Sequence, residues 1–280
     1  MDIKHTLMRC IRFFVNVFKE KKIMPYPVLT NSSNLLEGKI ALITGGSSGI
    51  GYSIAKAFVK SGARVIIAAR DEDKMRKCCE ELGGDKSRYI FLDISKIELL
   101  DKKIKEAIQL FDDNKIDILV NSAGVLAKND LFSMTEEEWD IIMDTNAKGV
   151  YFLTRIVAKN MIENEIKGHI LNVTSSSALR PAWTPYQLSK WVVEGLTMGL
   201  ADILIPYGIT VNAIAPGPTA TPMMNKKEDE SIFCTNPAGR YVMPDEIANI
   251  AVMLASDLGN MIIGNTVYVT GGSGTISMHS

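Results

Sequence analysis

The feature of this chain that most constrains its fold is an alternation of short apolar runs with longer helical patterns. The runs are nearly continuous, which is typical of strands in a parallel sheet covered on both faces. This order predicts an α/β fold with one doubly wound, Rossmann-type parallel sheet of seven strands. We predict strands over residues 40–43, 64–68, 89–92, 117–120, 169–173, 210–214 and 266–269, and helices over 50–60, 71–82, 95–111, 135–164, around Tyr186 and over 244–256.

The chain divides into a short N-terminal extension and one long domain. Residues 1–36 carry apolar side chains at helical spacing between lysines and arginines, followed by a polar linker that contains two prolines. We expect a basic amphipathic helix over residues 3–22 that contacts either a membrane surface, its own domain or a sister subunit. Residues 37–280 are long enough to form one domain with a sizeable core.

Composition excludes several classes of protein. The formal net charge is −1, so the chain as a whole has no attraction to nucleic acid. No run of about 18 apolar residues is present, and we expect no transmembrane helix. The four cysteines and three histidines lack metal-ligand spacing. We therefore expect no metal site, reduced thiols and a cytoplasmic protein.

A glycine-rich loop follows the first predicted strand. Residues 44–51 read TGGSSGIG, and the next helix begins there. Glycines allow the backbone to approach a pyrophosphate, and a helix N-terminus offers unpaired N–H groups and the positive end of its dipole. In a doubly wound sheet, ligands bind at the carboxyl ends of the strands, where this loop lies. The loop therefore predicts a dinucleotide site, although a plain glycine turn is the alternative.

A second motif lies after the fifth predicted strand, where a run of hydroxyls leads to Tyr186 and Lys190. Four residues apart on a helix, these two side chains share one face. We expect the ammonium to lower the pKa of the phenol by about two to three units, which suits a proton donor or acceptor. A buried tyrosine beside an exposed lysine on an amphipathic helix is the alternative interpretation.

Taken together, the loop, the hydroxyl run and the Tyr–Lys pair resemble the short-chain dehydrogenase/reductase family in its shorter, single-domain type. The resemblance covers about residues 37–274 and implies an NAD(P)-dependent oxidoreductase that acts on CH–OH groups, and a homo-oligomer, dimer or tetramer. It implies catalytic roles for Asn146, Ser175, Tyr186 and Lys190, with Asn146 holding a water in the proton relay. The implied cofactor-binding residues are Gly45, Ser47, Ser48, Gly49, Ile50, Gly51, Arg70, Asp93, Ile94, Asn121, Ala123, Gly124, Tyr186, Lys190, Pro216, Gly217, Thr219 and Thr221.

Two departures from the family pattern concern the site. Ser122 replaces the second asparagine of the Asn-Asn-Ala-Gly signature. The gap from Ser175 to Tyr186 looks about two residues shorter than in the family, which leaves Ser176 as a competitor for the catalytic serine. We favour Ser175, because a deletion in the loop would leave the strand end unchanged.

The cofactor can be argued from charge at the end of the second predicted strand. NAD-specific relatives carry an acid there, whereas this chain has Ala69 followed by Arg70. A guanidinium is suited to bind a 2′-phosphate, so we expect NADP(H), with NAD(H) as the alternative.

The substrate is less constrained than the cofactor. Residues 219–240 are the predicted cover of the substrate, and residues 236–240 and 264–272 look like those of 3-oxoacyl-carrier-protein reductases. The alternatives are a sugar, steroid or general alcohol dehydrogenase, or a non-catalytic NADP-binding regulator.

Overall fold

The computed structural model describes residues 34–126, 130–224, 234 and 236–276 of the 280-residue chain. These residues belong to one compact unit that spans residues 31–280. The predicted basic helix lies outside the described residues, as do parts of the predicted substrate cover.

Seven parallel strands form a single sheet in the order β3-β2-β1-β4-β5-β6-β7. On the interior strand β1, Leu42 pairs with Ile66 of β2 on one side and with Leu119 of β4 on the other. The predicted seven-stranded, Rossmann-type fold is confirmed. The strands are β1 (Ile40–Thr44), β2 (Arg64–Ala69), β3 (Ser87–Phe91), β4 (Ile118–Asn121), β5 (His169–Val173), β6 (Thr210–Pro216) and β7 (Thr266–Val269).

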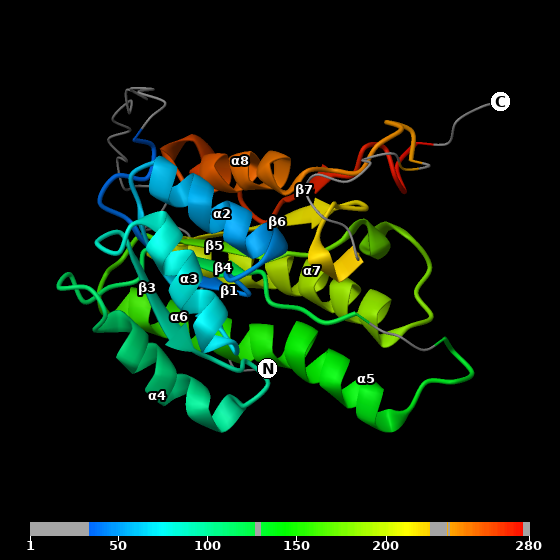
Figure 1. The fold of residues 1–280 in the computed structure, drawn as a ribbon, viewed down its shortest axis with the longest axis horizontal. Helices are drawn as coiled ribbons and strands as arrows, with labels where there is room; N and C mark the ends of the chain where they lie inside the picture. The colour runs from blue at the N-terminus through cyan, green and yellow to red at the C-terminus, as the bar shows by residue number, and fades with distance from the viewer. Residues whose placement is uncertain (1–33, 127–129, 225–233, 235, 277–280) are drawn as a thin grey trace, which may run out of the picture. The chain divides into compact units, whose positions relative to one another are not determined.

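Helices cover both faces of the sheet because the strands are apolar on both faces. The longer helices are α2 (Gly49–Lys60), α3 (Glu72–Leu82), α4 (Ile97–Ile108), α5 (Glu136–Met143), α6 (Val150–Glu163), α7 (Pro185–Leu204) and α8 (Pro244–Leu254). Helices α2 and α8 lie side by side on one face (Figure 1). Phe58 and Ile247 are fully buried there. Helices α4, α6 and α7 bury Leu100, Leu153 and Val193 against the other face. None of the helices in the described part of the chain is long and apolar enough to cross a membrane.

The winding of the sheet determines where a ligand can bind. The chain runs from β1 outward through β2 to β3, then returns to place β4 on the other side of β1. The carboxyl ends of β1 and β4 therefore meet at the point where the winding reverses, and a crevice forms between the loops that follow them.

The predicted helix over residues 135–164 is interrupted. Helices α5 and α6 are joined by a π-helical segment, Asp144–Gly149. Gly149 ends that segment against the main chain of Ile94, where a Cβ atom would collide with the Ile94 carbonyl oxygen at 2.5 Å. Hydrophobic periodicity does not encode the wider hydrogen-bond register of a π-helical turn, so the sequence pattern showed one continuous helix.

Candidate active site

The loop between β1 and α2 is a cradle made of main chain. Gly45 and Gly49 adopt positive φ angles of 66° and 52°, which glycine reaches without strain. A Cβ atom on Gly45 would lie 2.9 Å from Ala123 Cα, and one on Gly51 would collide with the Gly45 carbonyl. Ser48 is the N-cap of α2, but its side chain caps no N–H group. The glycines leave room for a ligand phosphate, and the first turn of α2 offers donors to it.

The chain after β4 forms the second wall of the crevice. Thr44 Oγ1 accepts hydrogen bonds from Ser122 N–H and Ala123 N–H, both at 3.1 Å, which ties this wall to the end of β1. Asn121 is buried, and its Nδ2 donates to Thr154 Oγ1 and Asn172 Oδ1 at 2.9 Å each. Asn121 therefore fixes the sheet behind the crevice, whereas Ala123 and Gly124 line it.

Tyr186 and Lys190 lie in the first turns of α7, as predicted. Thr184 caps this helix with a capping box that includes Gln187, and Pro185 occupies its first turn. Lys190 Nζ lies 5.6 Å from the centroid of the Tyr186 ring and donates to the Val173 carbonyl at 3.0 Å. Lys190 is buried, so the alternative of an exposed lysine on an amphipathic helix is wrong.

The expected lowering of the pKa of Tyr186 is also wrong. Burial raises the pKa of this phenol, and only a hydrogen bond with the Ser175 side chain acts in the opposite direction. Burial lowers the pKa of Lys190 to about 8. Loss of water is thus the main cause of both shifts, and Tyr186 carries its proton at neutral pH.

Ser175 and Ser176 differ in what their hydroxyls contact. Ser175 hydrogen-bonds Tyr186 and also accepts from Ser177 N–H at 3.1 Å, because it is the N-cap of the 3-10 turn Ser176–Leu179. Both serines line the cavity that holds Tyr186, but Ser176 is buried to 8% exposure. The contact with the phenol favours Ser175.

Asn146 lies in the π-helical segment and is 1% exposed. Its Oδ1 accepts from Val125 N–H and its Nδ2 donates to the Val125 carbonyl, each at 2.8 Å. Nδ2 also contacts Ser189 Oγ at 3.2 Å. A Cβ on Gly124 would meet Asn146 Oδ1 at 3.4 Å and Lys190 Nζ at 3.9 Å, which shows that these two groups converge behind Gly124.

Two neighbouring hollows flank the wall formed by Gly45, Ser48, Ala123 and Gly124. The first, of about 460 Å³, is lined by Gly45, Ser48, Gly49, Ile50, Gly51, Ala123, Gly124, Ser175, Tyr186, Lys190, Pro216, Gly217, Thr219 and Thr221 among others. The second, of about 350 Å³, is lined by Ser47, Arg70, Asp93 and Ile94 among others. All predicted site residues except Asn121 and Asn146 line one or the other. This extended site and its glycine cradle fit a dinucleotide.

Charged side chains line the second hollow. Arg70, Asp71 and Lys74 line it at the end of β2 and the start of α3. Asp93 turns back on its own loop, where its Oδ1 accepts from Ser95 N–H at 3.0 Å and from Ser95 Oγ at 2.7 Å. Arg70 and Lys74 thus provide two cations, and Asp71 and Asp93 two carboxylates, around this end of the site.

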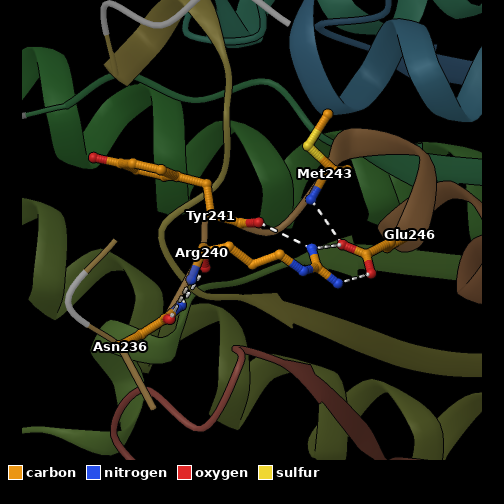
Figure 2. A network of polar contacts seen from close by, with 5 residues as sticks. All are labelled: Asn236, Arg240, Tyr241, Met243 and Glu246. Atoms are coloured by element: carbon orange, nitrogen blue, oxygen red, sulfur yellow. Dashed lines mark hydrogen bonds and ion pairs between the residues drawn. The ribbon is translucent and has the colours of Figure 1, made fainter. Parts of the chain in front are cut away.

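A polar network holds the segment that precedes α8 (Figure 2). Arg240 forms a two-pronged ion pair with Glu246 at 2.8 and 2.6 Å, and Glu246 also accepts from Met243 N–H at 2.9 Å. These contacts lower the pKa of Glu246 to about 2. Asn236 bonds both main-chain groups of Arg240. This segment also contacts residues 270–274, since Ala238 N–H donates to the Gly271 carbonyl at 3.0 Å.

Several side chains of the site were not among the predicted residues, and three of them bear on ligand binding. Lys74 lines the second hollow, and Arg180 and Ser273 line the first. The spacing of Arg70 and Lys74, four residues apart at a helix start, is a signal that could have indicated the second cation. Arg180 and Ser273 are 93 residues apart, and no sequence pattern joins them.

Comparison with known proteins agrees with this geometry. The family model described as short chain dehydrogenase matches residues 39–231. A (2S)-[(R)-hydroxy(phenyl)methyl]succinyl-CoA dehydrogenase subunit of Thauera aromatica is 36% identical over 85% of this chain and 97% of its own length. A 3-oxoacyl-[acyl-carrier-protein] reductase of Thermotoga maritima is 36% identical over 85% of this chain and 98% of its own.

A solved structure gives the same result. The 3-ketoacyl-(acyl-carrier-protein) reductase of Brucella melitensis, in complex with NADH, has a TM-score of 0.76 and 37% identity, covering 85% of this chain and 99% of that one. Fold, site and relatives agree, and the chain belongs to the short-chain dehydrogenase/reductase family of oxidoreductases that act on CH–OH and carbonyl groups.

Proposed function

We propose that this protein is an NADP(H)-dependent carbonyl reductase whose substrate is a 3-oxoacyl thioester. The observation that carries the proposal is the convergence of Ser175, Tyr186 and Lys190 on one cavity that is continuous with the glycine cradle. Two relatives are named as reductases of 3-oxoacyl or 3-ketoacyl carrier-protein substrates, which supports the thioester class.

The bound nicotinamide would supply or accept the hydride, and the side chains would manage the proton. Tyr186 donates its proton to the substrate oxygen, since its raised pKa keeps the phenol protonated at neutral pH. Ser175 stabilises the negative charge that develops on the same oxygen.

Lys190 and Asn146 support the tyrosine. Below pH 8 Lys190 is a cation, which favours a phenolate after proton transfer. Asn146 is fixed on Val125 by two hydrogen bonds and contacts Ser189, whose hydroxyl donates to the Tyr186 carbonyl at 2.7 Å. In the proposed mechanism Asn146 would hold the water that returns a proton to the site.

Charge supports the choice of NADP(H). Arg70 and Lys74 are exposed at the hollow near the end of β2, where a 2′-phosphate would meet two cations. Two carboxylates also line this hollow, those of Asp71 and Asp93, and the Asp93 carboxylate accepts hydrogen bonds from Ser95. The Brucella relative is described with NADH, so NAD(H) is the alternative in the test.

Self-association is part of the proposal. Large apolar side chains are exposed on α5 and α7, among them Ile141 at 51%, Trp191 at 47%, Met198 at 59% and Ile203 at 58%. An exposed face of this kind is typical of a subunit interface. Light scattering coupled to gel filtration should give the mass of a dimer or tetramer, and the mass of one chain would contradict it.

The experiment that tests the function is a turnover screen. Purified protein is mixed with NADPH or NADH and with 3-oxoacyl thioesters, oxidised sugars, ketosteroids and simple ketones. We expect NADPH oxidation with the thioesters at the highest kcat/KM. Turnover of a sugar or steroid alone would replace the substrate class, and cofactor binding without any turnover would favour a regulator.

A further inference from the structure

Arg180 is a cation in the catalytic cavity with no role in the mechanism above. It follows the 3-10 turn that begins after Ser175, and it lines the cavity together with Ser175 and Tyr186. Its side chain is exposed, so it lies at the border between cavity and solvent.

Two hydrogen bonds hold Arg180, one through its side chain and one through its main chain. Its Nη2 donates to Ser273 Oγ at 2.9 Å, and Ser273 is only 8% exposed. The indole Nε1–H of Trp191 donates to the Arg180 carbonyl at 3.1 Å. Gly274 lies beside the guanidinium, and a Cβ there would approach Nε to 3.4 Å. The main chain and the side chain are both held, which lowers the entropic cost of binding a ligand.

The Arg180 guanidinium has more N–H donors than it uses within the described part of the chain. An arginine side chain carries five N–H donors, and one bond, to Ser273, is made here. Within the described ranges no carboxylate pairs with Arg180, whereas Arg240 forms a two-pronged ion pair with Glu246 (Figure 2). Arg240 is thus a structural arginine, and Arg180 is free to meet a ligand.

The other residues that line the cavity indicate the charge and polarity of the ligand it would bind. No aspartate or glutamate is among the described residues that line it, and the other cation, Lys190, is buried and bonded to the Val173 carbonyl. Leu126, Met223 and Met224 add apolar surface to the same wall. The cavity therefore suits a molecule with an apolar part and a negatively charged group.

We propose that Arg180, held by Ser273, is a specificity residue that binds an anionic group of the carbonyl substrate, a carboxylate or a phosphate. The inference rests on the proposed reductase function and narrows its substrate class to amphipathic, negatively charged carbonyl compounds. Charge-assisted, two-pronged contacts to guanidinium give both affinity and orientation, so the anion would also fix which carbonyl faces Tyr186.

The test compares three thioesters that share a 3-oxo group. Acetoacetyl-N-acetylcysteamine is neutral at the acyl end and in the carrier, 3-oxoadipyl-N-acetylcysteamine adds a carboxylate, and acetoacetyl-coenzyme A adds phosphates. We expect wild type to prefer one of the charged substrates at least tenfold in kcat/KM, and the preferred one identifies the source of the anion. Arg180→Ala should lose about 10- to 100-fold on that substrate, mainly through KM, and much less on the neutral one.

Two further variants separate recognition from folding. Arg180→Lys keeps the positive charge but lacks the paired N–H donors of the guanidinium. It should therefore recover part of the kcat/KM that Arg180→Ala loses on the charged substrate. Arg76→Ala removes an exposed arginine on α3 that pairs with Asp73 and lines neither hollow, and it should behave as wild type. An equal loss of Arg180→Ala on all three substrates, or no charge preference in wild type, would overturn the proposal.

A binding measurement keeps the proposal testable if no thioester is turned over, an outcome that would reject the proposed substrate class alone. Calorimetry then compares 4-oxopentanoate with its methyl ester on the NADP⁺-bound protein. Tighter binding of the acid by wild type, lost in Arg180→Ala, supports the role of Arg180. Equal affinity for acid and ester, or no detectable binding of the acid, contradicts it.

Discussion

The two ends of the cofactor site use opposite physical means. At the catalytic end, Lys190 is buried and Tyr186 is half-buried, and burial is the main cause of the shift in both pKa values. At the other end, Arg70, Asp71 and Lys74 are exposed, and their charges act through solvent. Under the proposed function, the chemistry depends on desolvation, while the choice of cofactor depends on surface charge. The two should respond separately to mutation, pH and salt.

The largest expected effect is at the catalytic end. Tyr186→Phe removes the proton donor without changing the shape of the ring, so kcat should fall by up to about 10⁴-fold. Steady-state rates of NADPH oxidation with the best thioester measure this loss. The circular dichroism spectrum should be unchanged, which serves as the control for folding.

Ser175→Ala should have the next largest effect. Loss of a donor to the developing oxyanion typically costs about 10²- to 10³-fold in kcat. Ser176→Ala is the matched control, since it removes a neighbouring hydroxyl from the same cavity. A large loss in Ser176→Ala with a small one in Ser175→Ala would reverse the assignment of the two serines.

Arg70→Ala tests the charged end. A guanidinium–phosphate contact contributes about 1.5–3 kcal/mol, so KM for NADPH should rise about ten- to a hundredfold while KM for NADH stays nearly the same. Because the contact is exposed, its contribution should weaken between 50 and 500 mM salt, where the Debye length shortens below about 10 Å. If wild type already prefers NADH, or if Arg70→Ala affects both cofactors equally, the charge argument fails.

The smallest expected effect is a change with pH in the free energy of unfolding of the cofactor-free protein. Lys190 has a pKa of about 8 when folded, well below the value of 10.5 for an exposed lysine. Between these values the folded state has released a proton that the unfolded state still binds, so stability rises with pH. From pH 8 to pH 9 the contribution is about 1 kcal/mol. Urea unfolding should show this rise in wild type and a smaller one in Lys190→Met; equal slopes in the two proteins would contradict the buried amine.

The fold was predictable because it follows from local pattern. The apolar run at residues 40–43 indicates a strand, and the glycine loop that follows it indicates a turn and a phosphate-binding site. The π-helical segment at Asp144–Gly149 was not predictable, since its hydrogen-bond register leaves the apolar spacing nearly unchanged.

The site was predictable where it depends on residues close in sequence. Tyr186 and Lys190 are one helical turn apart, and the structure places them together. The sign of the change in the pKa of Tyr186 was wrong, because spacing shows that a charge is near but not how much water is lost. Arg180 and Ser273 meet only through the fold, so sequence spacing alone could not join them.

One measurement tests the separation of chemistry from cofactor binding most directly: the Kd of Tyr186→Phe for NADPH, obtained by fluorescence titration beside its turnover. The glycine cradle and the charged end are untouched in this variant, so we predict a Kd within a few-fold of wild type together with the loss of turnover. Turnover close to that of wild type would contradict the role of Tyr186. A Kd weakened in proportion to the lost activity would show that binding and chemistry are not separate.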